Sequence, residues 1–343
     1  MVFLRQKTDF FYLQEGKFVL LLTHIILSRQ NPFKIRPPRT KGAHDMTTTT
    51  ALALLLATLS IGVHQVEGVM IKKYNSKHNV GGFIFTALIS LFAMIFFFIT
   101  DKNGLCFPPL LILYGVISGI FFCTASFLTY VAFGCGSFVL SNLFLSYSLL
   151  FSVGYGLFVL KESATVMTYI GLALMMISVF LVKSKKKQEN DIESEKVKIS
   201  FKWVVCIVLS VIGSGMFGVM QKLQQVQFAK AYDNEFMIVT YAFTVITLMA
   251  IGIIMDGKNL FYILRHGGLY AAFAGMSNGA TNFLNLVVNA MIPISIAAPT
   301  RSGIKIVISF LISLVIFKER LTKKQVAGVI FGAAALILLN LKI

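Results

Sequence analysis

The chain has 343 residues and is strongly apolar: 57% of its residues are hydrophobic, 13% are charged, and the mean hydropathy is +0.80. Soluble domains do not have this composition, so an integral membrane protein is expected. The formal net charge of +17 lies largely in predicted loops. Membrane orientation explains such charge better than a contiguous nucleic-acid-binding face does, and no nucleic-acid partner is expected.

The first 45 residues differ from the rest of the chain. They contain eight Lys and Arg against three Asp and Glu, and their apolar run, residues 18–27, is too short to span a bilayer. Met46 and the four threonines after it form a natural helix start before the first long apolar segment. We expect residues 1–45 to be a basic N-terminal extension that is disordered or lies upstream of the true start.

Ten segments are long and apolar enough to cross the hydrocarbon core as helices, which takes about 17–25 residues each. They are residues 51–71, 80–100, 109–133, 138–160, 165–182, 203–220, 236–255, 268–292, 294–317 and 324–341. The predicted fold class is therefore an all-α integral membrane protein with ten transmembrane helices.

Short sequence words recur in order through the two halves of the chain. They are Gly68-Val69-Met70 with Gly218-Val219-Met220, Phe127-Leu128 with Phe283-Leu284, and Lys161-Glu162 with Lys318-Glu319, at offsets of 150, 156 and 157 residues. This pattern predicts a first five-helix repeat at 46–182, a polar linker at 183–202 and a second repeat at 203–343. Because five is odd, the second repeat must enter the membrane from the opposite side. Inverted repeats of this kind place substrate sites near the midplane between the halves.

The chain resembles the drug/metabolite transporter (DMT) superfamily in its EamA-type ten-helix branch. The resemblance rests on the five-plus-five repeat, on Lys318-Glu-Arg-Leu-Thr322, on the looser Lys161-Glu-Ser-Ala-Thr165, and on Gly171 and Gly328 after them. The proline usual midway along the fourth span of each repeat is missing, with Leu149 and Ile306 near that place. The resemblance implies a secondary transporter or exporter of small metabolites.

A polar stripe in the eighth predicted span suggests the substrate site. Asn278, Asn282, Asn285 and Asn289 lie within a stripe roughly 60° wide on a helix. The stripe indicates either a cavity lining or hydrogen-bonding contacts between helices, and Asn289, near the span's end, is its weakest member. Ser214 of the sixth span is deep enough to extend the cavity, unlike Gln221, Gln224 and Gln225 nearby.

Arg301 and Lys305 lie one turn apart inside the ninth predicted span, at about the depth of Asn282 and Asn278. Buried cations in a membrane are costly and usually functional, so a substrate with a carboxylate or phosphate is expected. His64 and Glu67 share one face of the first span and are candidates for proton coupling. The alternative for Glu67 is a permanent ion pair with Lys305.

The remaining features are interpreted as structural. Glu162 and Glu319 are predicted to anchor helix ends, and Gly115-x-x-x-Gly119 and Gly275-x-x-x-Gly279 to be close-packing helix faces. The four cysteines show no CxxC pair and no histidine at ligand spacing, so neither a metal nor a cofactor is expected.

The sequence thus predicts a non-enzymatic secondary transporter, an exporter or exchanger of small polar metabolites, in the plasma (inner) membrane. Its partners would be the metabolite, the lipid bilayer and a coupling proton, and it would be a monomer or homodimer. Two alternatives stay open: a proton-coupled multidrug exporter of lipophilic cations, and a non-transporting membrane scaffold. Loop charges and the family resemblance favour opposite orientations of the termini.

Overall fold

The computed structural model describes residues 43–78, 80–101, 104–155, 201–229, 231–292, 294–318 and 323–340, with seven further positions between 166 and 177. These residues are 92% helical and contain no strand, which confirms the all-α prediction for this part of the chain. The chain divides into two units, Met1–Thr47 and Thr48–Ile343, and every contact described below lies in the second.

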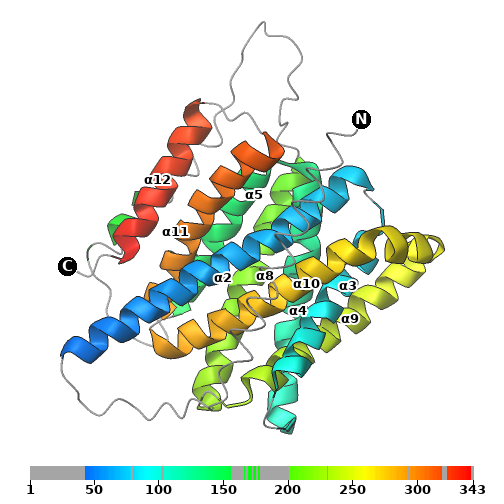
Figure 1. Ribbon diagram of the computed structural model, residues 1–343, viewed down its shortest axis with the longest axis horizontal. Helices are drawn as coiled ribbons and strands as arrows, with labels where there is room; N and C mark the ends of the chain where they lie inside the picture. The colour runs from blue at the N-terminus through cyan, green and yellow to red at the C-terminus, as the bar shows by residue number, and fades with distance from the viewer. Residues whose placement is uncertain are drawn as a thin grey trace, which may run out of the picture. The chain divides into compact units, whose positions relative to one another are not determined.

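The main helices follow the order of the predicted segments (Figure 1). They are α2 (Ala43–Lys77), α3 (Gly82–Thr100), α4 (Pro109–Cys135), α5 (Phe138–Leu145), α6 (Leu149–Gly154), α8 (Phe201–Gln227), α9 (Asp233–Asp256), α10 (Leu260–Met291), α11 (Ile294–Ile312) and α12 (Lys323–Asn340). Tight 3-10 turns at Ser146–Ser148 and Gly257–Asn259 join α5 to α6 and α9 to α10, and a π-helical turn, Ser313–Phe317, follows α11. The predicted segment 165–182 and the linker 183–202 lie outside the described residues, apart from the isolated positions.

Five helical stretches of the described chain are long and apolar enough to cross a membrane. They are Ala51–Lys77, Gly82–Thr100, Pro109–Cys135, Phe201–Gln227 and Asp233–Met291, the last of which contains both α9 and α10. Two shorter apolar helices are Phe138–Ser148 and Ile304–Phe317. This content fits an integral membrane protein.

Several helices are longer than hydropathy predicts. α2 begins at Ala43 rather than Met46 and ends at Lys77 rather than residue 71, α8 ends at Gln227, and α10 begins at Leu260. The turns added at the end of α8 carry polar side chains that bond to neighbouring helices; for example, Gln225 Nε2 donates to the Leu286 carbonyl oxygen at 3.2 Å. A hydropathy window stops at such residues, whereas these tertiary hydrogen bonds stabilise the helix beyond them.

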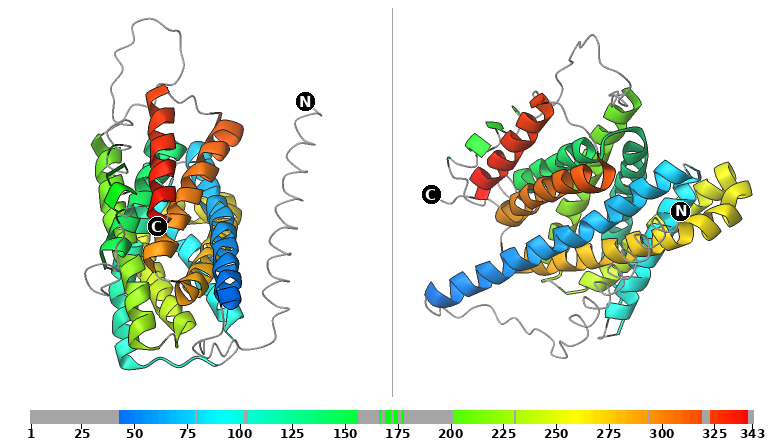
Figure 2. Two further views of the ribbon diagram at one scale, coloured as in Figure 1. Left: turned by 90° about the vertical axis from the view of Figure 1, so that its left-hand side faces the viewer. Right: turned by 45° about the horizontal axis from the view of Figure 1, so that its top comes forward.

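The helices of the second unit pack closely through small residues. α3 packs against both α9 and α10, α4 against α8 and α9, and α11 against α12 (Figures 1 and 2). A Cβ atom on Gly275 would lie 2.3 Å from the Ile89 carbonyl oxygen, and one on Gly119 would lie 2.7 Å from the Phe243 ring. The two predicted close-packing faces are confirmed, because only glycine permits these backbone approaches.

The start of α3 depends on a glycine for a different reason. Gly81 has φ of 64°, in the left-handed region that disfavours side chains, and a Cβ there would lie 2.0 Å from Ile263 Cδ1. The turn from α2 into α3 therefore packs directly onto α10.

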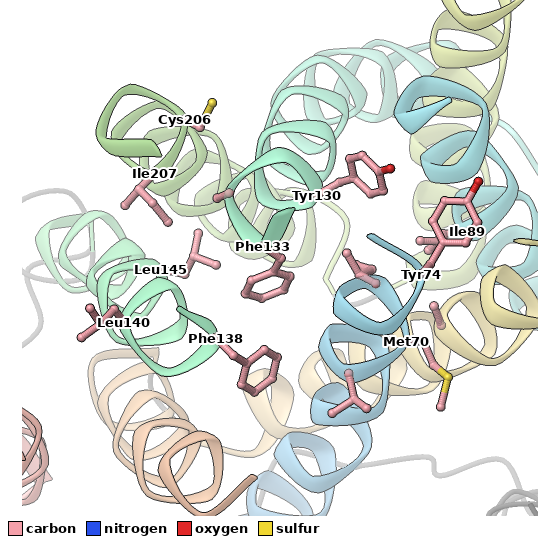
Figure 3. Close-up of a cluster of buried hydrophobic side chains, with 14 of the residues drawn as sticks. Met70, Tyr74, Ile89, Tyr130, Phe133, Phe138, Leu140, Leu145, Cys206 and Ile207 are labelled. Carbon is pink, nitrogen blue, oxygen red and sulfur yellow. The ribbon is translucent and has the colours of Figure 1, made fainter. Parts of the chain in front are cut away.

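Buried aromatic and aliphatic side chains join α2, α4, α5 and α8 (Figure 3). The rings of Phe133 at the end of α4 and Phe138 at the start of α5 have centroids 5.3 Å apart. Trp203 of α8 donates from Nε1 to Ser141 Oγ at 3.0 Å. Phe133 also lines the cavity described next, so this core fixes one wall of the candidate site.

Candidate functional site

A cavity of about 250 Å³ lies among α2, α4, α5, α8, α10 and α11. Its lining contains all eight residues that the sequence predicts for substrate binding or coupling: His64, Glu67, Ser214, Asn278, Asn282, Asn285, Arg301 and Lys305. These residues come from four helices and are as far apart as 241 positions in the chain. Side chains chosen only by spacing and depth are therefore brought together at one place, while their roles stay predictions.

The asparagine stripe divides into two pairs with different partners. In the first pair, Asn278 Nδ2 donates to Glu67 Oε2 at 2.9 Å, and Asn278 Oδ1 accepts from Tyr241 Oη at 2.5 Å. Asn282 Nδ2 donates to Tyr241 Oη at 3.0 Å, and its Oδ1 accepts from Gln221 Nε2 at 3.3 Å. These hydrogen bonds connect the Glu67 carboxylate of α2 to side chains of three other helices, α10, α9 and α8. A connected buried network of this kind stabilises one arrangement of its members.

The second pair of asparagines binds the cation of Arg301. Arg301 Nη1 donates to Asn289 Oδ1 at 3.0 Å and to Asn285 Oδ1 at 3.4 Å. Asn289 is 2% exposed and makes the shorter of the two bonds. Unlike Asn278, Asn282 and Asn285, it is not among the described residues that line the cavity, which agrees with its ranking as the weakest member of the stripe. Both acceptors are neutral amides, which leave the guanidinium charge uncompensated.

Lys305 lines the cavity without a direct bonding partner among the described residues. In this part of the chain its ammonium makes no hydrogen bond and no ion pair. The alternative of a Glu67–Lys305 ion pair finds no direct contact, since no nitrogen–oxygen approach within 4.0 Å joins the two side chains. Glu67 bonds to Asn278 and is the carboxylate whose charge acts on the Lys305 ammonium across the cavity.

His64 and Glu67 are neighbours on the cavity face of α2, as their spacing of three predicts. His64 Nδ1 lies 3.3 Å from Glu67 Oε2, without the alignment of a hydrogen bond. The His64 side chain is 33% exposed and that of Glu67 12%. The charged residues of the lining are thus Arg301, Lys305 and Glu67, with a formal net charge of +1 when His64 is neutral.

α4 and α8 supply the opposite part of the lining. Phe122, Ser126 and Thr129 come from α4, and Ser214 and Phe217 from α8. Gln221 also lines the cavity and bonds to Asn282, which corrects the expectation that only Ser214 of this helix is deep enough. The difference arises because α8 continues for about two turns past the predicted end.

Tyr241 and Gln65 are the functional neighbours that sequence reasoning missed. Tyr241 is fully buried behind the asparagines, and Gln65 Oε1 accepts a hydrogen bond from Ser309 Oγ at 3.1 Å, which links α2 to α11. A tyrosine in an apolar span gives no distinctive signal, because aromatic residues pack in such spans for many reasons. Gln65, between His64 and Glu67, was the more detectable of the two.

The described residues contain no group of three or more metal-ligating side chains. The two predicted helix-end anchors, Glu162 and Glu319, lie outside the described residues. Lys318, which precedes Glu319, ends its helix in a left-handed conformation with φ of 50°.

Comparison with known proteins gives the fold and no family. No protein-family model matches the chain, and no curated protein is similar to it. A solved crystal structure, described only as "Crystal structure of protein", is similar with a TM-score of 0.58 at 14% sequence identity. The match covers 84% of this chain and 98% of that one, so nearly the whole of that fold recurs here.

Proposed function

We propose that the chain is a secondary transporter of small anionic metabolites in the EamA-type ten-helix branch of the DMT superfamily. It would work as an exporter or exchanger in the plasma (inner) membrane, moving its substrate by alternating access through the cavity. The substrate would carry a carboxylate or phosphate group.

The observation that carries this proposal is that two cations, Arg301 and Lys305, line one cavity with a single described carboxylate, Glu67, and that neither cation makes an ion pair among the described residues. A cation removed from water without a counter-ion is unfavourable, and an anionic ligand would remove that penalty. Arg301 has five N–H donors, and among the described residues it makes two hydrogen bonds, both from Nη1 to amide oxygens, so it retains donors for a planar anion. The same net positive lining argues against a carrier of lipophilic cations.

Corresponding contacts in the two halves support the inverted repeat. Asn75 Nδ2 donates to the Tyr130 carbonyl and Gln225 Nε2 to the Leu286 carbonyl, in positions offset by 150 and 156 residues. With the same offsets, Ser210 Oγ donates to the Ala125 carbonyl and Thr281 Oγ1 to the Ser60 carbonyl. Gly81 and Tyr232, the residues before α3 and α9, share the left-handed conformation with φ of 64° and 62°. These offsets match those of the recurring sequence words, and such agreement is expected if the halves are copies.

Glu67 is the proposed coupling residue. It is the one carboxylate in the described lining, it contacts His64, and its bond to Asn278 connects it to α10. Binding of a proton to Glu67 would raise the formal charge of the described lining from +1 to +2, and thereby alter its affinity for an anion. A Glu67→Gln variant that keeps the wild-type pH dependence of transport would refute this role.

The transport proposal is tested with purified protein in liposomes. Uptake of labelled glutamate, inorganic phosphate and glucose 6-phosphate is compared with that of glucose and of tetraphenylphosphonium. We expect saturable uptake of at least one anion, with little of the neutral or cationic probe. Arg301→Gln and Lys305→Met should abolish it, whereas Arg265→Gln, which removes an exposed cation of α10 outside the cavity, should not. Normal anion uptake by both cavity variants would contradict the proposal.

A further inference from the structure

Two histidine rings from different helices meet outside the cavity. His78 directly follows α2, and His266 lies near the start of α10. Their ring centroids are 5.6 Å apart with an interplanar angle of 44°. The transport proposal makes no use of either residue.

Tyr262 contacts the Nδ1 atom of both histidine rings. His266 Nδ1 lies 3.1 Å from the Tyr262 carbonyl oxygen, which can only accept, so this nitrogen carries the proton and donates it. His78 Nδ1 lies 2.9 Å from Tyr262 Oη. In the tautomer in which His78 Nδ1 donates to that hydroxyl oxygen, neither Nε2 carries a proton, and neither makes a hydrogen bond among the described residues. Fixing one imidazole nitrogen so that the other can bind is the usual support of a metal-ligating histidine.

The separation of the rings fits a shared ion. With a Zn–N bond of about 2.1 Å and about 1.1 Å from ring nitrogen to ring centre, each centroid would lie about 3.2 Å from the metal. A tetrahedral angle at the metal then separates two centroids by about 5.2 Å. The observed 5.6 Å is close to this value.

We propose that His78 and His266 bind a divalent transition metal such as Zn²⁺ between the end of α2 and the start of α10. Imidazole nitrogen suits Zn²⁺, Ni²⁺ and Cu²⁺, whereas Mg²⁺ and Ca²⁺ require oxygen ligands. The described residues provide no third ligand, so water completes the coordination and the ion is exchangeable. A bound ion would join the helix that carries Glu67 to the helix that carries Asn278.

Neighbouring groups keep His78 in the form that binds metal. Burial, His266 and Lys77 together hold the pKa of His78 below its usual value of 6.5. Lys77 is the closest competing charge, and it is engaged elsewhere: its Nζ donates to Tyr270 Oη at 3.2 Å and lies 5.9 Å from that ring's centroid. Tyr74, whose ring centroid is 5.4 Å from that of His78, adds no charge at neutral pH.

Zinc binding is measured by isothermal titration calorimetry on the full chain, which is solubilised in detergent and purified with a tag that contains no histidine. We expect one Zn²⁺ per chain and no response to Mg²⁺. The test variants are His78→Phe and His266→Phe, which keep a ring against Tyr262 but cannot ligate. Each should lower zinc affinity at least about tenfold, and the double variant should lose little more, because two ligands of one ion act as a unit. The control is the double variant His24→Ala and His44→Ala, which should bind zinc normally.

Thermal unfolding without metal shows whether the variants keep the fold. If a phenylalanine variant is unstable, modification of the wild-type histidines by diethyl pyrocarbonate replaces it, and Zn²⁺ should protect His78 and His266 together. Absence of zinc binding below 100 µM in the wild type, or wild-type affinity in either single variant, would overturn the proposal. The second result would place the metal elsewhere, for example on the exposed Cys106 or Cys135.

Discussion

Replacing Lys305 by methionine should make the protein more stable and less able to bind anions. The ammonium has no partner among the described residues and lies in a cavity within the helices. Methionine has a similar length and no charge, so it removes the penalty of an unpaired, desolvated cation. Replacing a buried ion pair by apolar side chains of similar volume is often neutral or stabilising by about 1–4 kcal/mol, and Lys305 lacks even a direct pairing among the described residues. We expect a rise in the thermal midpoint of the ligand-free protein.

The same change should weaken anion binding. A carboxylate oxygen about 4 Å from Lys305 Nζ gains about 4 kcal/mol at an effective dielectric constant of about 20. Desolvation reduces this gain, and hydrogen bonds to charged groups contribute about 1.5–3 kcal/mol net. Because about 1.4 kcal/mol corresponds to a factor of ten, affinity should fall by about ten- to a hundredfold.

The assay measures both effects on one sample. Thermal unfolding is followed with and without increasing anion, using whichever of glutamate, phosphate or glucose 6-phosphate stabilises the wild type. Lys258→Met is the matched control, since Lys258 lies in the turn between α9 and α10 and outside the cavity. If Lys305→Met is less stable than the wild type and responds to anion equally well, then Lys305 is a structural residue and the reasoning fails.

Three further predictions concern the network, the packing and the coupling. Tyr241→Phe removes a hydroxyl bonded to two asparagines and should lower the free energy of unfolding by about 1–3 kcal/mol, as seen in thermal or denaturant unfolding. Gly275→Ala should disturb α3 strongly, because its Cβ would lie 2.3 Å from a carbonyl oxygen, whereas Gly268→Ala on the same helix meets nothing within 4 Å and should stabilise by up to about 1 kcal/mol. Equal stability of the two alanine variants would contradict the packing argument. Glu67→Gln should flatten the pH dependence of transport in liposomes, and an unchanged profile would exclude Glu67 as the coupling group.

The sequence was sufficient to predict the long helices because each of them is a long apolar segment. The predicted span 138–160 was not recognised as broken, and the structure divides its described part into α5, a 3-10 turn and α6. The sequence was also less informative at helix ends, where the polar residues that end a hydropathy segment turned out to hold the helix in place. Gln225 and Lys72 lie in such turns: Gln225 donates to the Leu286 carbonyl of α10, and Lys72 to the Gly136 carbonyl in the turn between α4 and α5. Hydropathy measures the preference of a residue for lipid over water, and it contains no information about a partner on another helix.

The same limit applies to the site. Spacing and depth were enough to select the eight lining residues, because both follow from helix geometry alone. The pairing was not predictable: Asn278 could have bonded to lipid-facing neighbours, and Glu67 could have paired with Lys305. Both Asn278 and Asn282 bond to Tyr241, and no periodic pattern in the sequence marks that tyrosine. The position of a residue on a polar stripe follows from one helix, whereas its hydrogen bonds depend on the helices packed against it.

If the two halves are repeats as proposed, their helices are arranged symmetrically, but the side chains that line the cavity are not equivalent. In three cases both equivalent positions of the two halves line the cavity. They are Glu67 and Phe217, Asn278 and Phe122, and Lys305 and Ser148. In each pair the ionic or amide member has an uncharged, less polar counterpart. A symmetric frame gives two similar conformations, open to opposite sides, that differ little in free energy. The two lining cations, Arg301 and Lys305, both lie on α11. The ligand would therefore keep one orientation in both conformations, with its anionic group at α11. If the chain transports as proposed, its substrate should therefore pair an anionic end with an apolar or aromatic end that lies against Phe122 and Phe217.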